Sequence, residues 1–123
     1  MNITHPPVVN HDDRGMIIDV LKGQTDAATL ISLEQYAERG HHYHKDTTQW
    51  VYILRGTVMT TTTKYAIKSG IARVVLVQGD MIRHDPGEMH TMKGLEYSVI
   101  LVLTRGPRSG EDYESDTYRC TDQ

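Results

Sequence analysis

The chain has a single cysteine and no apolar run long enough to cross a membrane. Cys120 lies in a polar C-terminal segment, so the sequence offers neither an intramolecular disulfide nor a pair of thiols for metal or redox chemistry. A bilayer span needs about 20 consecutive apolar residues, and the N-terminus lacks the basic start and apolar core of a secretion signal. We therefore expect a soluble, cytoplasmic protein with no membrane partner.

Neither sign of charge dominates the sequence. Thirteen Lys and Arg residues oppose sixteen Asp and Glu residues, which gives a net charge of −3, and the two signs are interspersed. Binding to a phosphate backbone requires a broad basic face, so nucleic acid is not an expected partner. A nucleotide remains possible, because one or two arginines in a pocket can hold a diphosphate.

Long helical patterns, internal repeats and low-complexity segments are also missing. A chain of 123 residues suits one domain spanning residues 1–123, which can bury roughly two thirds of its unfolded surface without disulfides. The polar ends, residues 1–12 and 107–123, are expected to form terminal arms that are mobile or pack on a partner subunit.

Short segments rich in Val, Ile, Thr and Tyr make up most of the remaining sequence. They cover residues 15–21, 28–36, 49–56, 57–63, 65–69, 72–79 and 97–106. These residue types favour strands, and the Gly, Pro, Asp and Lys residues between the segments favour turns. Seven short strands without a long helix predict an all-β sandwich or barrel of antiparallel strands.

The segment ERGHHYHKDTTQW, residues 38–50, is the densest group of functional side chains. In an extended strand, residues two apart face the same side. His42 and His44 should therefore point together, while His41 and Tyr43 point the other way. Two neutral imidazoles on one face can each give or take a proton near neutral pH. The pair could therefore act as catalytic bases, hold a metal ion, or belong to a surface turn without chemistry.

Gln49 and His90 are the expected neighbours of the histidine pair. If the chain reverses after His44, Gln49 lies on the same inner face, and the Pro86-Gly87 turn leads into a strand that carries His90. Three imidazoles and one amide oxygen suit Fe, Mn, Ni or Zn. One divalent metal ion held by His42, His44, Gln49 and His90 is therefore an alternative, although an amide is a weaker ligand than a carboxylate.

Two segments resemble the motifs of the cupin superfamily. The first motif is matched by Gly40, His42, His44, Gln49 and Gly56, with glutamine where a glutamate usually stands. The second is matched by Gly79, Pro86, Gly87 and His90, with one extra residue between the first glycine and the proline. The resemblance implies a single-domain cupin-type jelly-roll barrel.

The run RGHHYHKDTTQ is similar to RG-x-H-A-H-K-x-x-x-Q of the sugar-nucleotide 3,4-ketoisomerases, with Tyr43 in place of the alanine. DDRG, residues 12–15, resembles a segment near the start of these enzymes and of related deoxysugar epimerases. Residues 111–119 loosely resemble their closing segment. The resemblance implies a homodimeric isomerase or epimerase that needs no metal cofactor and acts on a thymidine-diphosphate keto-deoxysugar.

The resemblance also implies roles for individual residues. His42 and His44 would transfer protons through an enediol-type intermediate. Arg39 would hold a sugar oxygen or the diphosphate, and Gln49 and His90 would bind substrate. The ring of Tyr43 leaves the substrate open, as well as the choice between isomerisation and epimerisation.

Several prominent residues have a structural interpretation instead. His41 should lie on the surface, Lys45 should be a solvated turn charge, and His84, which precedes a turn, should be structural or exposed. Trp50 should face away from Gln49 and pack outside the barrel. Two other functions stay open: a metal-dependent cupin of the dioxygenase or lyase type, and a cupin that binds a small molecule without catalysis.

Overall fold

The computed structural model describes residues 2–64, 71–107 and 115–120, and the regular elements in these ranges are β-strands. They are β1 (Asn2–Thr4), β2 (Val8–Asp12), β3 (Gly15–Ile18), β4 (Ala27–Leu33), β5 (Glu38–Tyr43), β6 (Thr48–Arg55), β7 (Thr57–Lys64), β8 (Ala72–Val77), β9 (Met81–His84), β10 (Glu88–Gly94), β11 (Ser98–Arg105) and β12 (Tyr118–Arg119). In these ranges no helix is long and apolar enough to cross a membrane. The expected all-β fold is confirmed.

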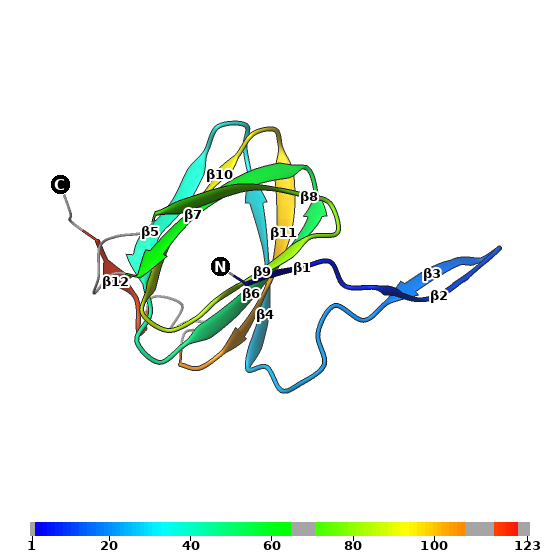
Figure 1. Ribbon diagram of the computed structural model, residues 1–123, viewed down its shortest axis with the longest axis horizontal. Coiled ribbons are helices and arrows are strands. Elements are labelled where there is room, and N and C mark those ends of the chain that lie inside the picture. Colours follow the sequence, from blue (N-terminus) through cyan, green and yellow to red (C-terminus); the bar gives the residue numbers. More distant parts are fainter. Residues whose placement is uncertain (1, 65–70, 108–114, 121–123) are drawn as a thin grey trace.

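Two antiparallel five-stranded sheets face each other and enclose the core (Figure 1). One sheet has the order β1-β9-β6-β11-β4 and the other has the order β12-β5-β10-β7-β8. The core between them consists of buried aliphatic and methionine side chains: Leu33, Val51, Ile53, Val58, Leu76, Ile82, Met92, Ile100 and Val102. Since burial of apolar surface is the dominant stabilising contribution, this interlayer packing holds the two sheets in place.

A second apolar layer covers the outer face of the first sheet. Tyr52, Met81 and Leu103 are buried there, with Val20 and Trp50 packed against them. Successive residues of a strand point to opposite faces, so Trp50 faces outward where Gln49 faces inward. The Arg105 guanidinium lies 5.0 Å from the centre of the Trp50 ring. Trp50 thus packs outside the barrel, as the sequence predicted.

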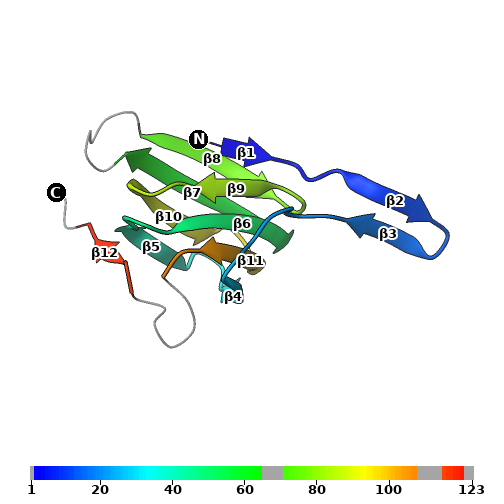
Figure 2. The same ribbon diagram turned by 90° about the horizontal axis from the view of Figure 1, so that it is seen from below.

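Within the described residues, β2 and β3 pair with each other and with no other strand, and they project from the barrel as an arm (Figures 1 and 2). The DDRG segment forms its tip, where the carboxylate of Asp12 accepts hydrogen bonds from the backbone and the guanidinium of Arg14. The arm exposes four large apolar side chains, Val8, Val9, Met16 and Ile17. An isolated two-stranded ribbon is only marginally stable in water. What stabilises an arm that exposes these apolar side chains therefore has to be explained.

The described part of the C-terminal segment is attached to the second sheet through β12. Tyr118 pairs with Tyr43 and Arg119 pairs with His42 across β12 and β5. The rings of Tyr43 and Tyr118 stack with their centres 5.4 Å apart, and the Lys45 ammonium lies 4.4 Å from the Tyr118 ring centre. A cation over a stacked aromatic pair fixes this short strand.

Six of the seven predicted strand segments overlap β3, β4, β6, β7, β8 and β11. The seventh, residues 65–69, lies outside the described residues, as do residues 108–114 and 121–123 of the predicted C-terminal arm. The N-terminal arm is longer than the predicted residues 1–12, since its hairpin continues to Ile18. Its first strand, β1, is part of the barrel because it pairs with β9.

Gly40 lies where β5 approaches β10, and there is no room for a side chain. Its φ of +107° is rare for L residues, and an added Cβ would lie 2.6 Å from the backbone carbonyl oxygen of His90. We expect Gly40→Ala to lower the free energy of unfolding by about 3 kcal/mol, measured by urea titration.

The matched control for this substitution is Gly87→Ala. Gly87 also has a positive φ, +86°, but an added Cβ there meets nothing within 4 Å. Gly87→Ala should therefore lower the free energy of unfolding only by the cost of holding an alanine at positive φ, about 1 kcal/mol. Equal losses in the two variants would show that the close approach to His90 is unimportant.

Candidate functional site

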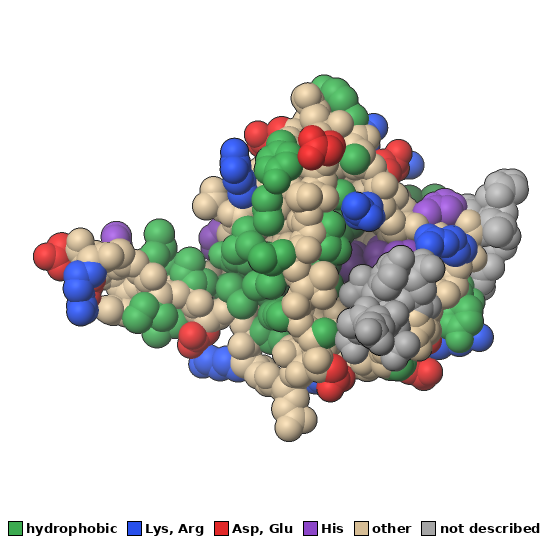
Figure 3. Space-filling view, turned by 180° about the vertical axis from the view of Figure 1, so that it is seen from behind, with side chains coloured by type: hydrophobic (Ala, Val, Ile, Leu, Met, Phe, Trp, Pro, Cys, Tyr) green, Lys and Arg blue, Asp and Glu red, His purple; other side chains and the backbone are tan. Residues whose placement is uncertain are grey.

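A cavity of about 730 Å³ opens between β4, an edge strand of one sheet, and β5 of the other, and it is bordered by β12, the edge strand beside β5. Apolar side chains line part of it, and polar side chains line the rest: Thr29, Ser32, Glu38, Arg39, His42, Gln49, His90, Thr117 and Arg119. Ligand sites are typically concave and mainly apolar, with a few convergent polar groups. Figure 3 shows histidine surface within a hollow, with Lys or Arg side chains beside it.

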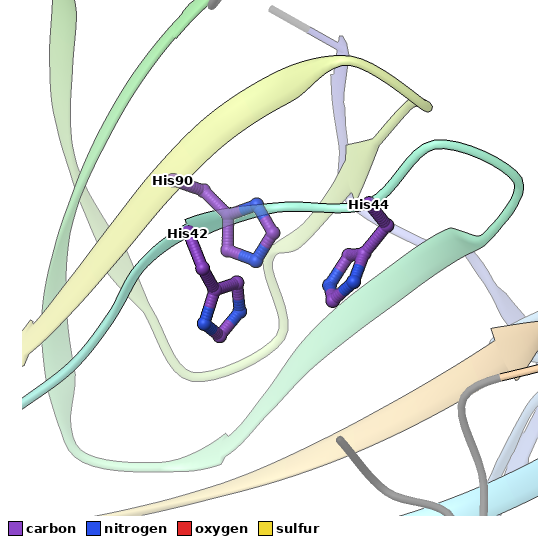
Figure 4. A group of neighbouring side chains, drawn as sticks. All are labelled: His42, His44 and His90. Carbon is purple, nitrogen blue, oxygen red and sulfur yellow. The ribbon is translucent and has the colours of Figure 1, made fainter. Parts of the chain in front are cut away.

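Three histidines converge at this cavity. His42 comes from β5, His44 follows directly after β5, and His90 comes from β10 (Figure 4). A nitrogen from each ring lies within 4.8 Å of one from each of the others. His90 therefore reaches the histidine pair from a neighbouring strand, as the sequence predicted.

A bulge in β5 sets which way these histidines point. His42 pairs with His90, but Gly40 pairs with the next residue, Thr91, so His41 is the extra residue. His41 has a φ of 60° and is exposed. Extra residues of this kind re-aim the neighbouring side chains. His42 consequently faces the cavity, and Tyr43 faces outward onto Tyr118.

Backbone carbonyls define the proton positions on two of the rings. Nδ1 of His44 lies 2.9 Å from the carbonyl oxygen of Asp116, and Nδ1 of His90 lies 3.2 Å from that of Glu88. A carbonyl can only accept, so each Nδ1–H must donate. In the neutral rings, therefore, the lone pairs are on Nε2.

Gln49 contacts His44 in a way that suits either protonation state. Oε1 of Gln49 lies 3.2 Å from Nε2 of His44, and this oxygen accepts a hydrogen bond when Nε2 carries a proton. When Nε2 is unprotonated, rotation of the amide by 180° presents the NH₂ group as donor. A glutamate would satisfy only the charged ring, so glutamine suits a histidine that changes protonation state.

Asp116 fixes the turn that follows His44. Its carboxylate accepts hydrogen bonds from the backbone N–H groups of Lys45 and Asp46 and from the hydroxyl of Thr47. Burial raises the pKa of Asp116, but these hydrogen bonds outweigh it and the pKa is lowered. Asp116 therefore stays charged near neutral pH and holds its own carbonyl against His44.

A fourth imidazole, His84, lies behind this group. It is 1% exposed, and its ring stacks on that of His90 with centres 4.3 Å apart and planes 12° apart. Within the described residues, neither ring nitrogen of His84 has a hydrogen-bond partner. Burial, followed by the proximity of His44 and His42, lowers the pKa of His84 to about 4. Burial and the neighbouring imidazoles likewise lower the pKa of His90.

The predicted site residues differ in their position relative to the cavity. Arg39, His42, Gln49 and His90 line the cavity, whereas His44 is 2% exposed and lies behind this lining. Sequence reasoning did not single out three further residues at the site, Asp116, Thr117 and Arg119. Of the two possibilities predicted for His84, structural or exposed, the structure shows a buried residue, and its place two residues after the apolar Ile82 in one strand would have favoured burial.

No protein-family model and no curated protein matches this chain. Solved structures do match. The sugar 3,4-ketoisomerase QdtA from Thermoanaerobacterium thermosaccharolyticum, in complex with TDP, has a TM-score of 0.80 at 17% identity, covering 98% of this chain and 88% of its own. A 3,4-ketoisomerase from Helicobacter canadensis has a TM-score of 0.80 at 16% identity, covering 97% and 90%.

The dTDP-4-dehydrorhamnose 3,5-epimerase from Sulfolobus tokodaii is also similar, with a TM-score of 0.74 at 18% identity. The match covers 85% of this chain and 70% of the epimerase. The spatial agreement extends over most of each chain, while the identities are low. The chain therefore has the cupin-type jelly-roll fold that its two sequence motifs predicted, the fold that these sugar-nucleotide enzymes share.

Proposed function

We propose that this protein is an isomerase or epimerase that acts on a nucleotide-linked keto-deoxysugar by proton transfer. The observation that carries the proposal is the position of His42 on the cavity wall, with Gln49 and His90 beside it and His44 behind. Similarity to solved 3,4-ketoisomerases and to a 3,5-epimerase supports the same class of substrate.

The proposed reaction needs one group to remove a proton from carbon and one to return a proton. Moving a carbonyl from C4 to C3 requires loss of the C3 proton, an enediol-type intermediate and protonation at C4. His42 and His44 would carry these transfers, because imidazole has a pKa near neutrality. Their ring centres are 4.9 Å apart, and the Gln49 amide can serve His44 before and after it changes charge.

The experiment is to incubate the purified protein in D₂O with a thymidine-diphosphate 4-keto-6-deoxysugar and follow the sugar protons by NMR. We expect loss of the C3 proton signal, with deuterium at C4 of a 3-keto product if the protein is an isomerase, or at an inverted C3 of the 4-keto sugar if it is an epimerase. Binding of thymidine diphosphate is measured in parallel by calorimetry. Binding without exchange would favour a non-catalytic binding protein, and the absence of both would refute the proposal.

A divalent metal site is a second candidate function, favoured by the proximity of the three ring nitrogens. The Nε2 lone pairs of His44 and His90 suit Fe, Mn, Ni or Zn, with Gln49 as a fourth ligand. Nitrogens bound at about 2.1 Å to one ion lie about 3.0–3.4 Å apart, so the rings would have to close together. Stoichiometric metal in protein purified without added metal, lost in His90→Gln, would favour this function.

We also propose that the chain forms a homodimer through the β2–β3 arm, because its apolar side chains have no cover within the described part of the chain. Light scattering at micromolar concentration should give twice the mass of the chain. Lysine at both Val9 and Ile17, which are 57% and 56% exposed, should give a monomer, since charges at a contact surface prevent its burial.

The control for this experiment places lysine at Val75 and Val77 on β8. These side chains are similarly exposed, at 50% and 49%, but lie on the barrel rather than on the arm. This variant should remain dimeric. A wild-type protein that is monomeric at micromolar concentration would rule the dimer out.

A further inference from the structure

We infer that His84 is a positioning residue, whose ring fixes the plane of the His90 ring beside the proposed proton-transfer pair. The inference rests on the proposed function and deepens it, because it gives a role to a buried histidine that the proton transfers do not use. His84 is not among the described residues that line the cavity, whereas His90 is. His84 would therefore influence the substrate only through His90.

The two rings come from different sheets and meet between them. His84 ends β9 of the first sheet, where it pairs with Gln49, and His90 lies in β10 of the second. Residues directly opposite each other in an antiparallel pair share a face of the sheet, so His84 faces inward beside Gln49. The ring centres of His84 and His90 are 4.3 Å apart and their planes differ by 12°. The flat faces of the two rings are therefore in contact.

Stability does not account for a histidine at this position. His84 is 1% exposed, and within residues 2–64, 71–107 and 115–120 neither of its ring nitrogens has a hydrogen-bond partner. A buried polar atom without a partner costs free energy that an aliphatic side chain of similar volume does not. Ile82, two residues earlier on the same face of β9, is an aliphatic residue of this kind. What histidine has and an aliphatic residue lacks is a flat ring that can stack.

The turn between the two rings is held by its own hydrogen bonds, so the His90 side chain is what remains to be fixed. The N–H of Asp85 donates to the Glu88 carboxylate at 2.9 Å, and the N–H of Glu88 donates to the Asp85 carbonyl at 3.1 Å. The last torsion of a histidine side chain has broad energy minima. The hydrogen bond from Nδ1 of His90 to the Glu88 carbonyl restricts this rotation, and the face of His84 restricts it further.

The plane of the His90 ring in turn bears on His42. These two rings are nearly perpendicular, at 88°, with centres 4.7 Å apart, and they lie next to each other in Figure 4. Rotation of the His90 ring would change this edge-to-face contact and displace His42, the member of the pair that lines the cavity. A misplacement of about 1 Å can lower a reaction rate about 100-fold. The stack on His84 thus preserves the geometry that proton transfer needs.

The first test compares two variants in the D₂O exchange experiment at pH 7.5. His84→Leu keeps a similar volume but loses the flat face, and it should lower the exchange rate at saturating substrate by about 10- to 100-fold. His84→Phe keeps a flat ring without nitrogens and should exchange at close to the wild-type rate. The control is Ile82→Val, which removes one buried methyl group from the same strand. It should lower stability but leave the exchange rate unchanged.

NMR of the imidazole nitrogens in isotope-labelled protein gives a second measurement, which needs no substrate. In the wild type, His90 should show one set of signals with the proton on Nδ1. In His84→Leu, these signals should broaden or shift towards values averaged over both nitrogens. Identical His90 signals in the wild type and His84→Leu would reject the inference.

The remaining outcomes separate this inference from the proposed function. Equal loss of exchange in His84→Leu and His84→Phe would reject the inference, since that result assigns the effect to the nitrogens of His84 rather than to its flat face. A wild type that exchanges no deuterium, but whose His90 signals change in His84→Leu as expected, would reject the proposed function and support the positioning of His90 by His84.

Discussion

Replacing His42 by glutamine should lower the rate of solvent deuterium incorporation into the keto-sugar by about 10²- to 10⁴-fold, the usual contribution of a positioned general base. His42 is the member of the proposed proton-transfer pair that lines the cavity. Glutamine keeps hydrogen-bonding capacity at similar size but cannot take up a proton. The measurement is the initial rate of loss of the C3 proton signal at saturating substrate.

The adjacent His41 supplies the matched control for that experiment. It is exposed and has a φ of 60°, and asparagine tolerates this backbone region better than most residues. His41→Asn should retain the wild-type exchange rate. If His42→Gln exchanges as fast as the wild type while binding thymidine diphosphate normally, His42 is not the base and the proposed mechanism fails.

Acidification should destabilise the protein between about pH 6.5 and pH 4, a range set by the buried histidines. The folded-state pKa of His84 is about 4 and its ordinary value is 6.5. Below pH 6.5 the unfolded chain takes up a proton that the folded chain does not, so stability falls as the pH falls and levels off near pH 4. The difference corresponds to about 3 kcal/mol from His84 alone.

His90 acts in the same direction, because burial and the nearby imidazoles also lower its pKa. The carboxylate of Asp116, whose pKa is also lowered, loses its contribution only below its ordinary value of 3.8, which separates the two effects. Urea unfolding at pH 7.5, 6.5, 5.5 and 5.0 should therefore show a stability loss caused by the histidines. The slope of stability against pH measures the number of protons taken up on unfolding.

His84→Leu isolates the contribution of that ring. Leucine fills a similar volume and has no nitrogen to protonate, so the slope below pH 6.5 should fall by up to about one proton. The control His11→Gln changes an exposed histidine on the arm and should leave the slope unchanged. Identical slopes in the wild type and His84→Leu would mean that the buried ring is already protonated or does not resist protonation.

The fold could be predicted largely from strand patterning and the two histidine motifs. β6 and β11 are long, rich in β-branched residues and central in their sheet, and local sequence is most informative for such strands. β1 and β12 were not predicted, because they have three and two residues and exist only through their pairing with β9 and β5. Pairing over such distances leaves no periodic signal in the sequence.

The site was also predicted only in part, because some of its residues are brought together by pairing between segments far apart in the sequence. Strand alternation correctly predicted the directions in which His42 and Tyr43 point. The bulge at His41, which sets these directions in the structure, could not be predicted from alternation alone. Asp116 and Arg119 reach the site across long sequence separations, and neither stands out in a polar segment. His84 was assigned from the turn that follows it, whereas its pairing with Gln49 across β9 and β6 determines its burial.

The hydrogen bond from His44 to the carbonyl of Asp116 spans 72 residues, and this separation bears on the order of events during synthesis. A growing chain can form the core sheets before residue 116 emerges, since domains fold as their sequence becomes available. Contacts of long sequence separation form slowly. The nascent chain would then contain a nearly complete barrel in which His44 has not yet met the Asp116 carbonyl, and this part of the site would be completed only once residue 116 has emerged.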